Sequence, residues 1–270
     1  MYLDFYGLTA PPFEITPDPR YLFYSRRHRD ALEHVLFGLE QRKGFIQLTG
    51  EVGAGKTTLC RAILAQLKDG WATALILNPV MSSTQLLRSI LQELGLEARG
   101  HDRLRLTGRL NEFLLQRAGA GENVALFVDE AQDLSDALLE ELRLLSNLET
   151  DDRKLLQIVL IGQPELRARL AEPQLRQLNQ RILVRYHLKP LDRGETRAYI
   201  THRLTVAGAN GRPTFTAPAI WWVHHHSRGI PRLINALCDT TLLAGYAEGR
   251  DVLTWRHVHR AARALAGRDT

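Results

Sequence analysis

The stretch TGEVGAGKTT, residues 49–58, decides the fold of this chain. It matches the pattern G-x-x-x-x-G-K-[ST] in full, from Gly50 to Thr57. Glycines at these positions let successive backbone N–H groups curl around phosphate oxygens, and a following helix directs its positive end at the same group. The apolar segment GFIQLTG (44–50) before the loop is typical of a buried strand, and TTLCRAILAQL (57–67) after it of a helix. This context predicts a site for a nucleotide phosphate.

The loop and one later acidic pair supply the candidate ligands. The residues expected to bind ATP are Gly50, Glu51, Val52, Gly53, Ala54, Gly55, Lys56, Thr57 and Thr58. Lys56 is expected to reach the β- and γ-phosphates, and Thr57 to hold Mg²⁺ through its hydroxyl. Asp129 ends the apolar segment VALFVDEA (124–131) and is expected to hold Mg²⁺ by way of water. Glu130 is then placed to polarise the attacking water as general base. The alternative is an acidic pair at the solvent end of a strand.

The rest of the chain alternates strands with helices and then becomes helical. Strands are predicted at 44–50, 73–79, 124–131, 156–163 and 182–191, with helices between them. This alternation predicts an α/β fold in which a parallel sheet is covered on both faces, a three-layer αβα core. After Pro190, the pair Asp192 and Glu195 forms a capping box, and Thr216 and Thr254 cap later helices. We therefore expect an ATPase domain at 27–190 and a small all-α lid domain at 191–270.

The first 26 residues are expected to be a strap rather than a helix, because prolines such as Pro11 and Pro12 remove backbone donors. The aromatic side chains of Phe13, Tyr21 and Phe23 need a surface to pack on. They are expected either to line a pocket for adenine or to pack in a core. Farther along, Asp133 is predicted to be the N-cap of the helix that follows the acidic strand.

Composition narrows the setting of the protein. The 270 residues carry a net charge of +5 with a pI near 9.4, which leaves nucleic acid open as a partner. The arginines are scattered along the sequence, so the alternative to a nucleic-acid site is an ordinary solvated surface that is mildly basic. No apolar run approaches the roughly 20 residues of a membrane span. The first residues lack a basic signal region, and two lone cysteines suggest no disulfide framework, so a cytoplasmic protein is expected.

Several stretches resemble one family of ATPases over nearly the whole chain. They are FYGLTAPPFEITPDPRYLFYS, GFIQLTGEVGAGKTTLCR, FVDEAQDL, LRLLSNLETDDRKLLQIVLIGQPEL and HSRGIPRLINALC. Together they resemble the ExeA/GspA-like AAA+ ATPases of bacterial secretion and pilus assembly, and most nearly the branch that serves biogenesis of the mannose-sensitive haemagglutinin (MSHA) pilus. The longer secretion homologue continues into a membrane span and a peptidoglycan-binding domain. Because this sequence ends at AARALAGRDT, we do not expect it to act directly on peptidoglycan.

The resemblance implies an additional-strand P-loop fold, in which the fourth strand lies between the two motif strands. It also implies three further site residues. Gln163 would be a sensor of the γ-phosphate and the attacking water, the alternative being a turn residue before Pro164. Arg181 would reach the nucleotide of a neighbouring subunit, with Arg185 the second choice. Arg232, at the start of a lid helix, would contact the γ-phosphate within its own chain.

These features favour an ATP hydrolase that needs ATP and Mg²⁺ and assembles with itself as a ring. The resemblance implies that it acts on pilus or secretion assembly proteins, peripherally at the inner membrane of a bacterium. Two alternatives stay open. One is a DNA-binding AAA+ regulator of the transposition-ATPase type, which the basic pI supports although no helix-turn-helix appendage is evident. The other is a nucleotide-dependent scaffold with negligible turnover.

Overall fold

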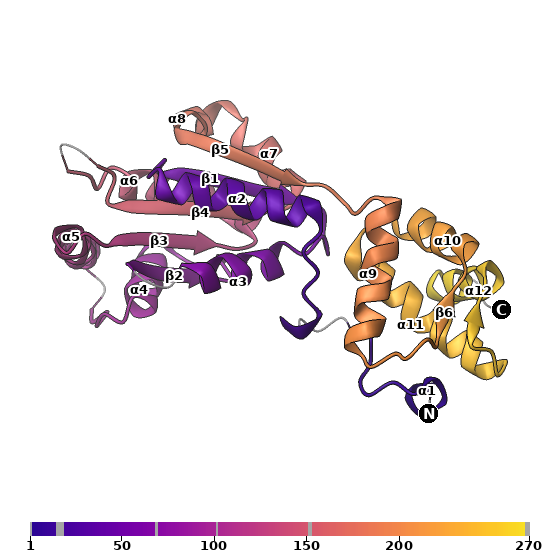
Figure 1. The fold of residues 1–270 in the computed structure, drawn as a ribbon. Helices are drawn as coiled ribbons and strands as arrows, with labels where there is room; N and C mark the ends of the chain where they lie inside the picture. The colour runs from indigo at the N-terminus through magenta and orange to yellow at the C-terminus, as the bar shows by residue number, and fades with distance from the viewer. Residues whose placement is uncertain (1, 15–18, 68–69, 101, 151–152, 268–270) are drawn as a thin grey trace. The chain divides into compact units, whose positions relative to one another are not determined.

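A computed structural model of the chain describes residues 2–14, 19–67, 70–100, 102–150 and 153–267 (Figure 1). The chain forms two compact units. The sheet unit comprises residues 28–50 and 59–188. The helical unit comprises residues 1–27, 51–58 and 189–270, so it includes both the N-terminal segment and the phosphate-binding loop. Each unit is described by itself below.

The sheet unit is built on five parallel strands, drawn as arrows in Figure 1. They are β1 (Phe45–Gly50), β2 (Trp71–Ile76), β3 (Asn123–Val128), β4 (Leu156–Gly162) and β5 (Ile182–Leu188). Their order across the sheet is β2-β3-β4-β1-β5, with β4 paired in parallel to both β1 and β3. The prediction that the fourth strand lies between the two motif strands is therefore confirmed, as are the five strands.

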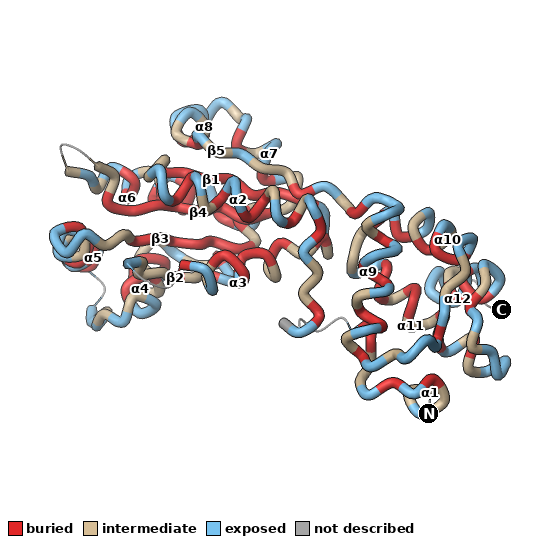
Figure 2. Tube along the Cα trace, in the orientation of Figure 1, coloured by how far each residue is buried: buried red, intermediate tan, exposed pale blue. Residues whose placement is uncertain are grey.

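Helices cover both faces of this sheet, which confirms the three-layer prediction. Those of this unit are α2 (Arg26–Glu40), α3 (Lys56–Gln66), α4 (Ser83–Glu93), α5 (Arg103–Gly119), α6 (Asp136–Leu145), α7 (Pro164–Leu170) and α8 (Arg176–Arg181). Alternate residues of β3, Val124, Leu126 and Val128, share one buried cluster with α4, α5 and α6. On the other face, α2 packs so closely that a Cβ on Gly38 would lie 2.8 Å from Ile46 of β1. Figure 2 shows the strands as the buried centre of the unit.

The expected N-cap at Asp133 is wrong. Glu130 adopts a left-handed backbone with φ of 50°, and the chain then makes one 3₁₀ turn, Ala131–Asp133. Leu134 is extended, and Ser135 caps α6 by accepting from the N–H of Leu138. Asp133 is therefore consumed in the short turn, because the left-handed residue delays the start of the helix by two positions.

The helical unit contains α9 (Arg193–Val206), α10 (Ala217–Ser227), α11 (Pro231–Ala247) and α12 (Trp255–Leu265). The predicted capping box of Asp192 and Glu195 is present at α9, and Thr216 caps α10. Thr254 forms a further capping box with His257 at α12. The unit also holds two strands of two residues each, β6 (Thr214–Phe215) and β7 (Val252–Leu253), which pair in parallel. Strands this short show no hydrophobic periodicity, so the sequence did not predict them.

The N-terminal segment packs in the core of the helical unit. Tyr6, Phe13 and Tyr21 are buried with the apolar side chains of α9, α10 and α11. The prediction that the segment contains no helix is wrong for its first turn, because Tyr2–Tyr6 forms α1 ahead of the first proline. Residues 15–18, which include Pro17, a further proline of the predicted strap, lie outside the described residues.

Candidate functional site

The phosphate-binding loop has the backbone that its sequence predicts. β1 ends at Gly50, and α3 begins at Lys56, so the loop joins a strand to a helix N-terminus. Gly53 and Gly55 have φ of 78° and 98°, conformations that side-chain-bearing residues rarely adopt. The loop therefore presents a curled backbone ahead of an eleven-residue helix, α3, which is the arrangement that suits an anionic phosphate. The residues present fit a nucleotide phosphate.

Lys56 is held in place within the loop. Its side chain is buried, with 6% of the residue exposed, and its Nζ donates a hydrogen bond to the carbonyl of Glu51 at 3.1 Å. The N–H of Ala54 donates to the same carbonyl at 3.1 Å. The lysine side chain is thus folded back onto the loop, and both are predicted to bind the same phosphates. Thr57 and Thr58 lie in the first turn of α3.

The predicted acidic and polar residues follow two neighbouring strands of the sheet unit. Asp129 comes directly after β3, and Gln163 directly after β4. Gly50 ends β1, on the other side of β4. Carboxyl ends of parallel strands meet at one edge of the sheet, and ligands of open α/β sheets bind at this edge. Asp129 is buried, and its Oδ1 accepts the backbone N–H of Glu130 at 2.9 Å.

Glu130 and Gln163 are in direct contact. The Nε2 of Gln163 donates to the Oε2 of Glu130 at 3.3 Å. The same carboxylate oxygen accepts a shorter hydrogen bond, 2.8 Å, from the Nε2 of Gln132. Sequence reasoning did not identify Gln132. Its position in FVDEAQDL, two residues past the glutamate, offers no signal of its own, because only the 3₁₀ turn brings the side chain back.

Arg232 lies against the phosphate-binding loop within the helical unit. It is the second residue of α11, after Pro231 at the first position. Its backbone N–H donates to the carbonyl of Gly53 at 3.3 Å. The contact is so close that a Cβ on Gly53 would lie 2.5 Å from the Cβ of Arg232. The residue predicted to act as the lid arginine therefore sits beside the predicted phosphate loop.

Arg181 and Arg185 both bond within their own unit. Arg181 Nη1 donates to Ser146 Oγ at 2.9 Å and to Asn147 Oδ1 at 2.5 Å, just past the end of α6. Arg185 Nη1 donates to Gln47 Oε1 at 3.1 Å, and its Nη2 bonds to Asn179. Neither guanidinium forms a contact with Glu130 or Gln163 in the sheet unit.

Comparison with known proteins agrees with this geometry. A family model described as an AAA domain matches residues 39–170. The chain is 47% identical over 268 residues to General secretion pathway protein A of Aeromonas hydrophila, an alignment that covers 99% of this chain and 49% of that protein. The chain belongs to the ExeA/GspA-like AAA+ family. It spans about half the length of the curated relative that it matches. The family and the fold support an ATPase that binds a nucleotide.

Solved structures with the same fold come from distant proteins. The ORC2 protein of Aeropyrum pernix, in complexes with ADPNP and ADP, is 20% identical with a TM-score of 0.64, over 93% of this chain and 70% of that one. Cdc6p of Pyrobaculum aerophilum is 16% identical with a TM-score of 0.71, over 94% and 70%. RuvB of Thermotoga maritima, a Holliday junction branch migration motor, is 20% identical with a TM-score of 0.58, over 90% and 70%. At these identities the likeness establishes the fold alone.

No helix among the described residues combines the length and apolar character needed to cross a bilayer. No group of three or more His, Cys, Asp or Glu side chains in the same residues is arranged to hold a metal ion.

Proposed function

We propose that this chain is a magnesium-dependent ATPase that hydrolyses ATP when copies of it assemble. The identity of 47% to General secretion pathway protein A along almost the whole chain carries the proposal. We further propose that the cycle drives assembly or remodelling of a type II secretion-related machine or of a type IV, MSHA-like pilus. The protein would act from the cytoplasmic side, peripherally at the inner membrane, on assembly proteins of that machine.

The proposed roles follow from the placement of each residue. The loop from Gly50 to Thr58 would bind the phosphates, with Lys56 released from the carbonyl of Glu51 to pair with them. Thr57 and Asp129 would hold Mg²⁺, which supplies charge neutralisation when bound. Glu130 would polarise the attacking water, as the paired Gln163 senses the γ-phosphate.

Two arginines would make hydrolysis respond to conformation and assembly. Arg232, on the loop-bound end of α11, would contact the γ-phosphate within its own chain. Arg181 would reach the nucleotide of a neighbour, and an arginine supplied in trans raises phosphoryl-transfer rates by about 10³–10⁵-fold in other systems. The proposed product of the cycle is motion of the helical unit, since phosphoryl transfer itself needs mainly positioning and charge stabilisation.

The proposal is tested by ATP binding and hydrolysis of the purified chain. Binding of a fluorescent ATP analogue is expected for the wild type and is expected to be lost in Lys56→Ala. Glu130→Gln is expected to bind the nucleotide and to hydrolyse it only at a small residual rate, because the amide cannot accept the proton of water. Specific activity is expected to rise with protein concentration as subunits meet. A chain that binds no ATP, or a monomer as active as the oligomer, would contradict the proposal.

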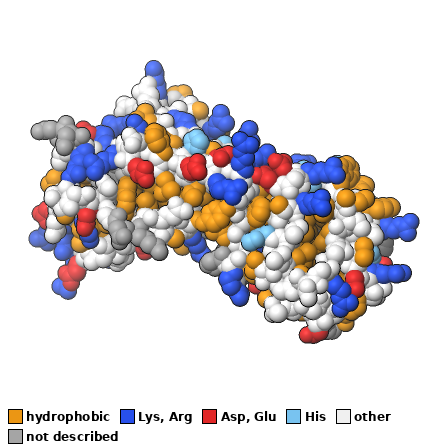
Figure 3. All heavy atoms as spheres, in the orientation of Figure 1, with side chains coloured by type: hydrophobic (Ala, Val, Ile, Leu, Met, Phe, Trp, Pro, Cys, Tyr) orange, Lys and Arg blue, Asp and Glu red, His pale blue; other side chains and the backbone are white. Residues whose placement is uncertain are grey.

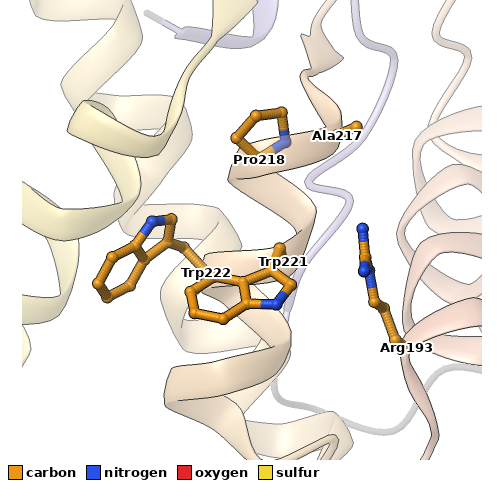
Figure 4. A pocket seen from close by; sticks show the side chains of 5 residues that line it. All are labelled: Arg193, Ala217, Pro218, Trp221 and Trp222. Atoms are coloured by element: carbon orange, nitrogen blue, oxygen red, sulfur yellow. The ribbon is translucent and has the colours of Figure 1, made fainter.

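One surface of the helical unit favours a second candidate, a DNA-binding AAA+ regulator. Helices α10 and α12 contain no aspartate or glutamate, and Trp221 and Trp255 are 41% and 43% exposed. The guanidinium of Arg256 lies 5.7 Å from the ring centroid of Trp255. A pocket of about 250 Å³ lies beside Trp221 and Trp222. Figure 4 shows Arg193 across from the two indole rings. Exposed aromatic rings beside arginines suit stacking of nucleic-acid bases.

The distribution of charge elsewhere is less favourable to this candidate. On the face that Figure 3 draws, Lys and Arg side chains are dispersed and interspersed with acidic ones rather than gathered in one stripe. The ATPase rate measured with and without duplex and single-stranded DNA, across salt concentrations, separates the two functions. Strong stimulation by DNA that disappears as salt rises would favour the regulator, because phosphate contacts weaken steeply with salt.

A further inference from the structure

The side chain of Gln132 bridges the two residues proposed to act on the attacking water. Its Nε2 donates to the Oε2 of Glu130 at 2.8 Å. Its Oε1 accepts the backbone N–H of Gln163 at 3.0 Å. All three residues belong to the sheet unit, at the carboxyl ends of β3 and β4. A single amide therefore connects the ends of two neighbouring strands.

The chemistry of its neighbours determines which way this amide points. A backbone N–H can only donate, so the atom that faces Gln163 must be the amide oxygen. An ionised carboxylate can only accept, so the atom that faces Glu130 must be the NH₂ group. The same NH₂ group lies 3.3 Å from Asp133 Oδ2. Glutamine meets these demands, whereas glutamate would place a third carboxylate among Glu130 and Asp133.

The surrounding structure holds the bridge in place. Arg169 of α7 donates through Nη1 to the backbone carbonyls of Gln132 and Leu134, at 2.7 and 2.6 Å, and its Nη2 pairs with Asp136. The side chain reaches the last residue of β4, where the absence of a Cβ leaves room for it, since a Cβ on Gly162 would lie 2.9 Å from Gln132 Oε1. Arg169 thus fixes the backbone of Gln132, and the room at Gly162 fixes the path of its side chain.

We propose that Gln132 is a positioning residue that orients the Glu130 carboxylate for water activation and makes its orientation depend on the end of β4. The inference rests on the proposed ATPase function. Glu130 has a left-handed backbone with φ of 50°, so local backbone preference does not favour its placement. The hydrogen bond from Gln132 is shorter than the one from Gln163, 2.8 against 3.3 Å, and a shift of Gln163 would be transmitted through the bridging amide.

Two variants separate positioning from folding. Gln132→Leu removes both hydrogen bonds at nearly constant size, and Gln132→Glu keeps the shape while replacing the donor by a carboxylate. Each is expected to lower the single-turnover rate of MgATP hydrolysis by about 10- to 100-fold, because small misplacements of a catalytic group are costly. The dissociation constant of a fluorescent ATP analogue is expected to stay within about twofold of wild type, since the phosphate loop is untouched.

A double-mutant cycle tests whether the effect passes through Glu130. If Gln132 acts by orienting that carboxylate, adding Gln132→Leu to Glu130→Gln is expected to cause no further loss of rate. The control for Gln132→Glu is Gln116→Glu, which makes the same substitution on the exposed face of α5 and is expected to leave the hydrolysis rate unchanged. The melting temperature of each variant shows whether it is folded. If Gln132→Leu is unstable, the rate of Gln132→Glu provides the test.

The outcomes are distinct. The inference is overturned if both Gln132 variants hydrolyse ATP at the wild-type rate, or if Gln132→Leu slows Glu130→Gln as much as it slows wild type. It is also overturned if nucleotide affinity falls together with the rate, which is the result of a merely structural role. If instead the wild type does not hydrolyse ATP, or Glu130→Gln retains its rate, the proposed function itself fails and this inference fails with it.

Discussion

The backbone N–H of Arg232 donates to the carbonyl of Gly53, so α11 of the helical unit begins directly on the phosphate-binding loop. Both residues belong to the helical unit. The phosphate-binding loop is part of that unit although the residues on either side of it in the sequence belong to the sheet unit. If the loop binds a nucleotide as proposed, the helix that carries Arg232 begins directly beside that nucleotide's binding loop. The contact links the predicted phosphate site to the predicted lid arginine through the backbone as well as the side chain.

Gly53→Ala is expected to weaken nucleotide binding by at least about tenfold, because the new Cβ would lie 2.5 Å from Arg232 Cβ and push α11 off the loop. The substitution also places alanine at φ of 78°, which costs about 1–2 kcal/mol by itself. Gly95→Ala isolates that strain, since Gly95 has φ of 76° and no neighbour within 4 Å of its Cβ. Titration with a fluorescent ATP analogue measures both. Equal affinities in the two variants would show that the Arg232 contact is unimportant for binding.

Subunit mixing tests Arg181. Arg181→Ala is expected to reduce hydrolysis by about a thousandfold, and Glu130→Gln by at least as much, when each is assayed alone. If Arg181 acts in trans, a mixture recovers activity, because random mixing makes about one interface in four competent. The local bonds of Arg181 to Ser146 and Asn147 would have to break on assembly. A mixture as inactive as its components would assign Arg181 to the structural role that those bonds describe.

Arg203 is expected to anchor the N-terminal segment to the helical unit. Its side chain is buried, and its guanidinium donates to the carbonyls of Pro12 and Glu14 and to the hydroxyl of Tyr199. It also lies 4.6 Å from the ring centroid of Tyr21. Arg203→Met would remove all three hydrogen bonds, although the carbonyl of Glu14 and the hydroxyl of Tyr199 each keep a hydrogen bond to Asn235. The substitution is expected to cost about 2–3 kcal/mol of the free energy of unfolding.

Thermal denaturation measures this loss, and Arg197→Met on the exposed face of the same helix is the control. A surface change of this kind is expected to stay within about 0.5 kcal/mol of wild type. Limited proteolysis adds a local readout, because a released N-terminal segment becomes a substrate. Unchanged melting and unchanged cleavage of Arg203→Met would mean that the packing of aromatic side chains holds the segment without the guanidinium.

Both thiols are expected to be unreactive in the folded protein. Burial, with the nearby Asp129 carboxylate adding to it, raises the pKa of the Cys60 thiol to about 12. Burial likewise raises the pKa of Cys238 well above its ordinary value. Since the thiolate is the reactive form, a maleimide at pH 8 is expected to label neither residue until denaturant is added. Rapid labelling of the native protein would indicate that α3 or α11 opens readily.

The fold was predictable because each signal for it is local. A glycine-rich loop between an apolar strand and a helix, five apolar segments of strand length, and capping residues such as Asp192 and Thr216 are all contained in short stretches. The acidic pair Asp129–Glu130 was predicted to belong to the site for the same reason, because it directly follows an apolar segment. Errors arose where conformation depends on one unusual backbone residue. The left-handed Glu130 inserts a 3₁₀ turn, which moved the helix cap from Asp133 to Ser135.

The sequence by itself determined the class of protein, the phosphate-binding loop and the succession of strands and helices along the chain, because contiguous residue patterns encode them. Only the tertiary structure decided which distant residues meet. It assigned the N-terminal segment to the helical core, placed Arg232 on Gly53, and set the amide of Gln132 between Glu130 and Gln163. Such contacts depend on strand order and helix packing across many residues, so no short stretch of the chain encodes them.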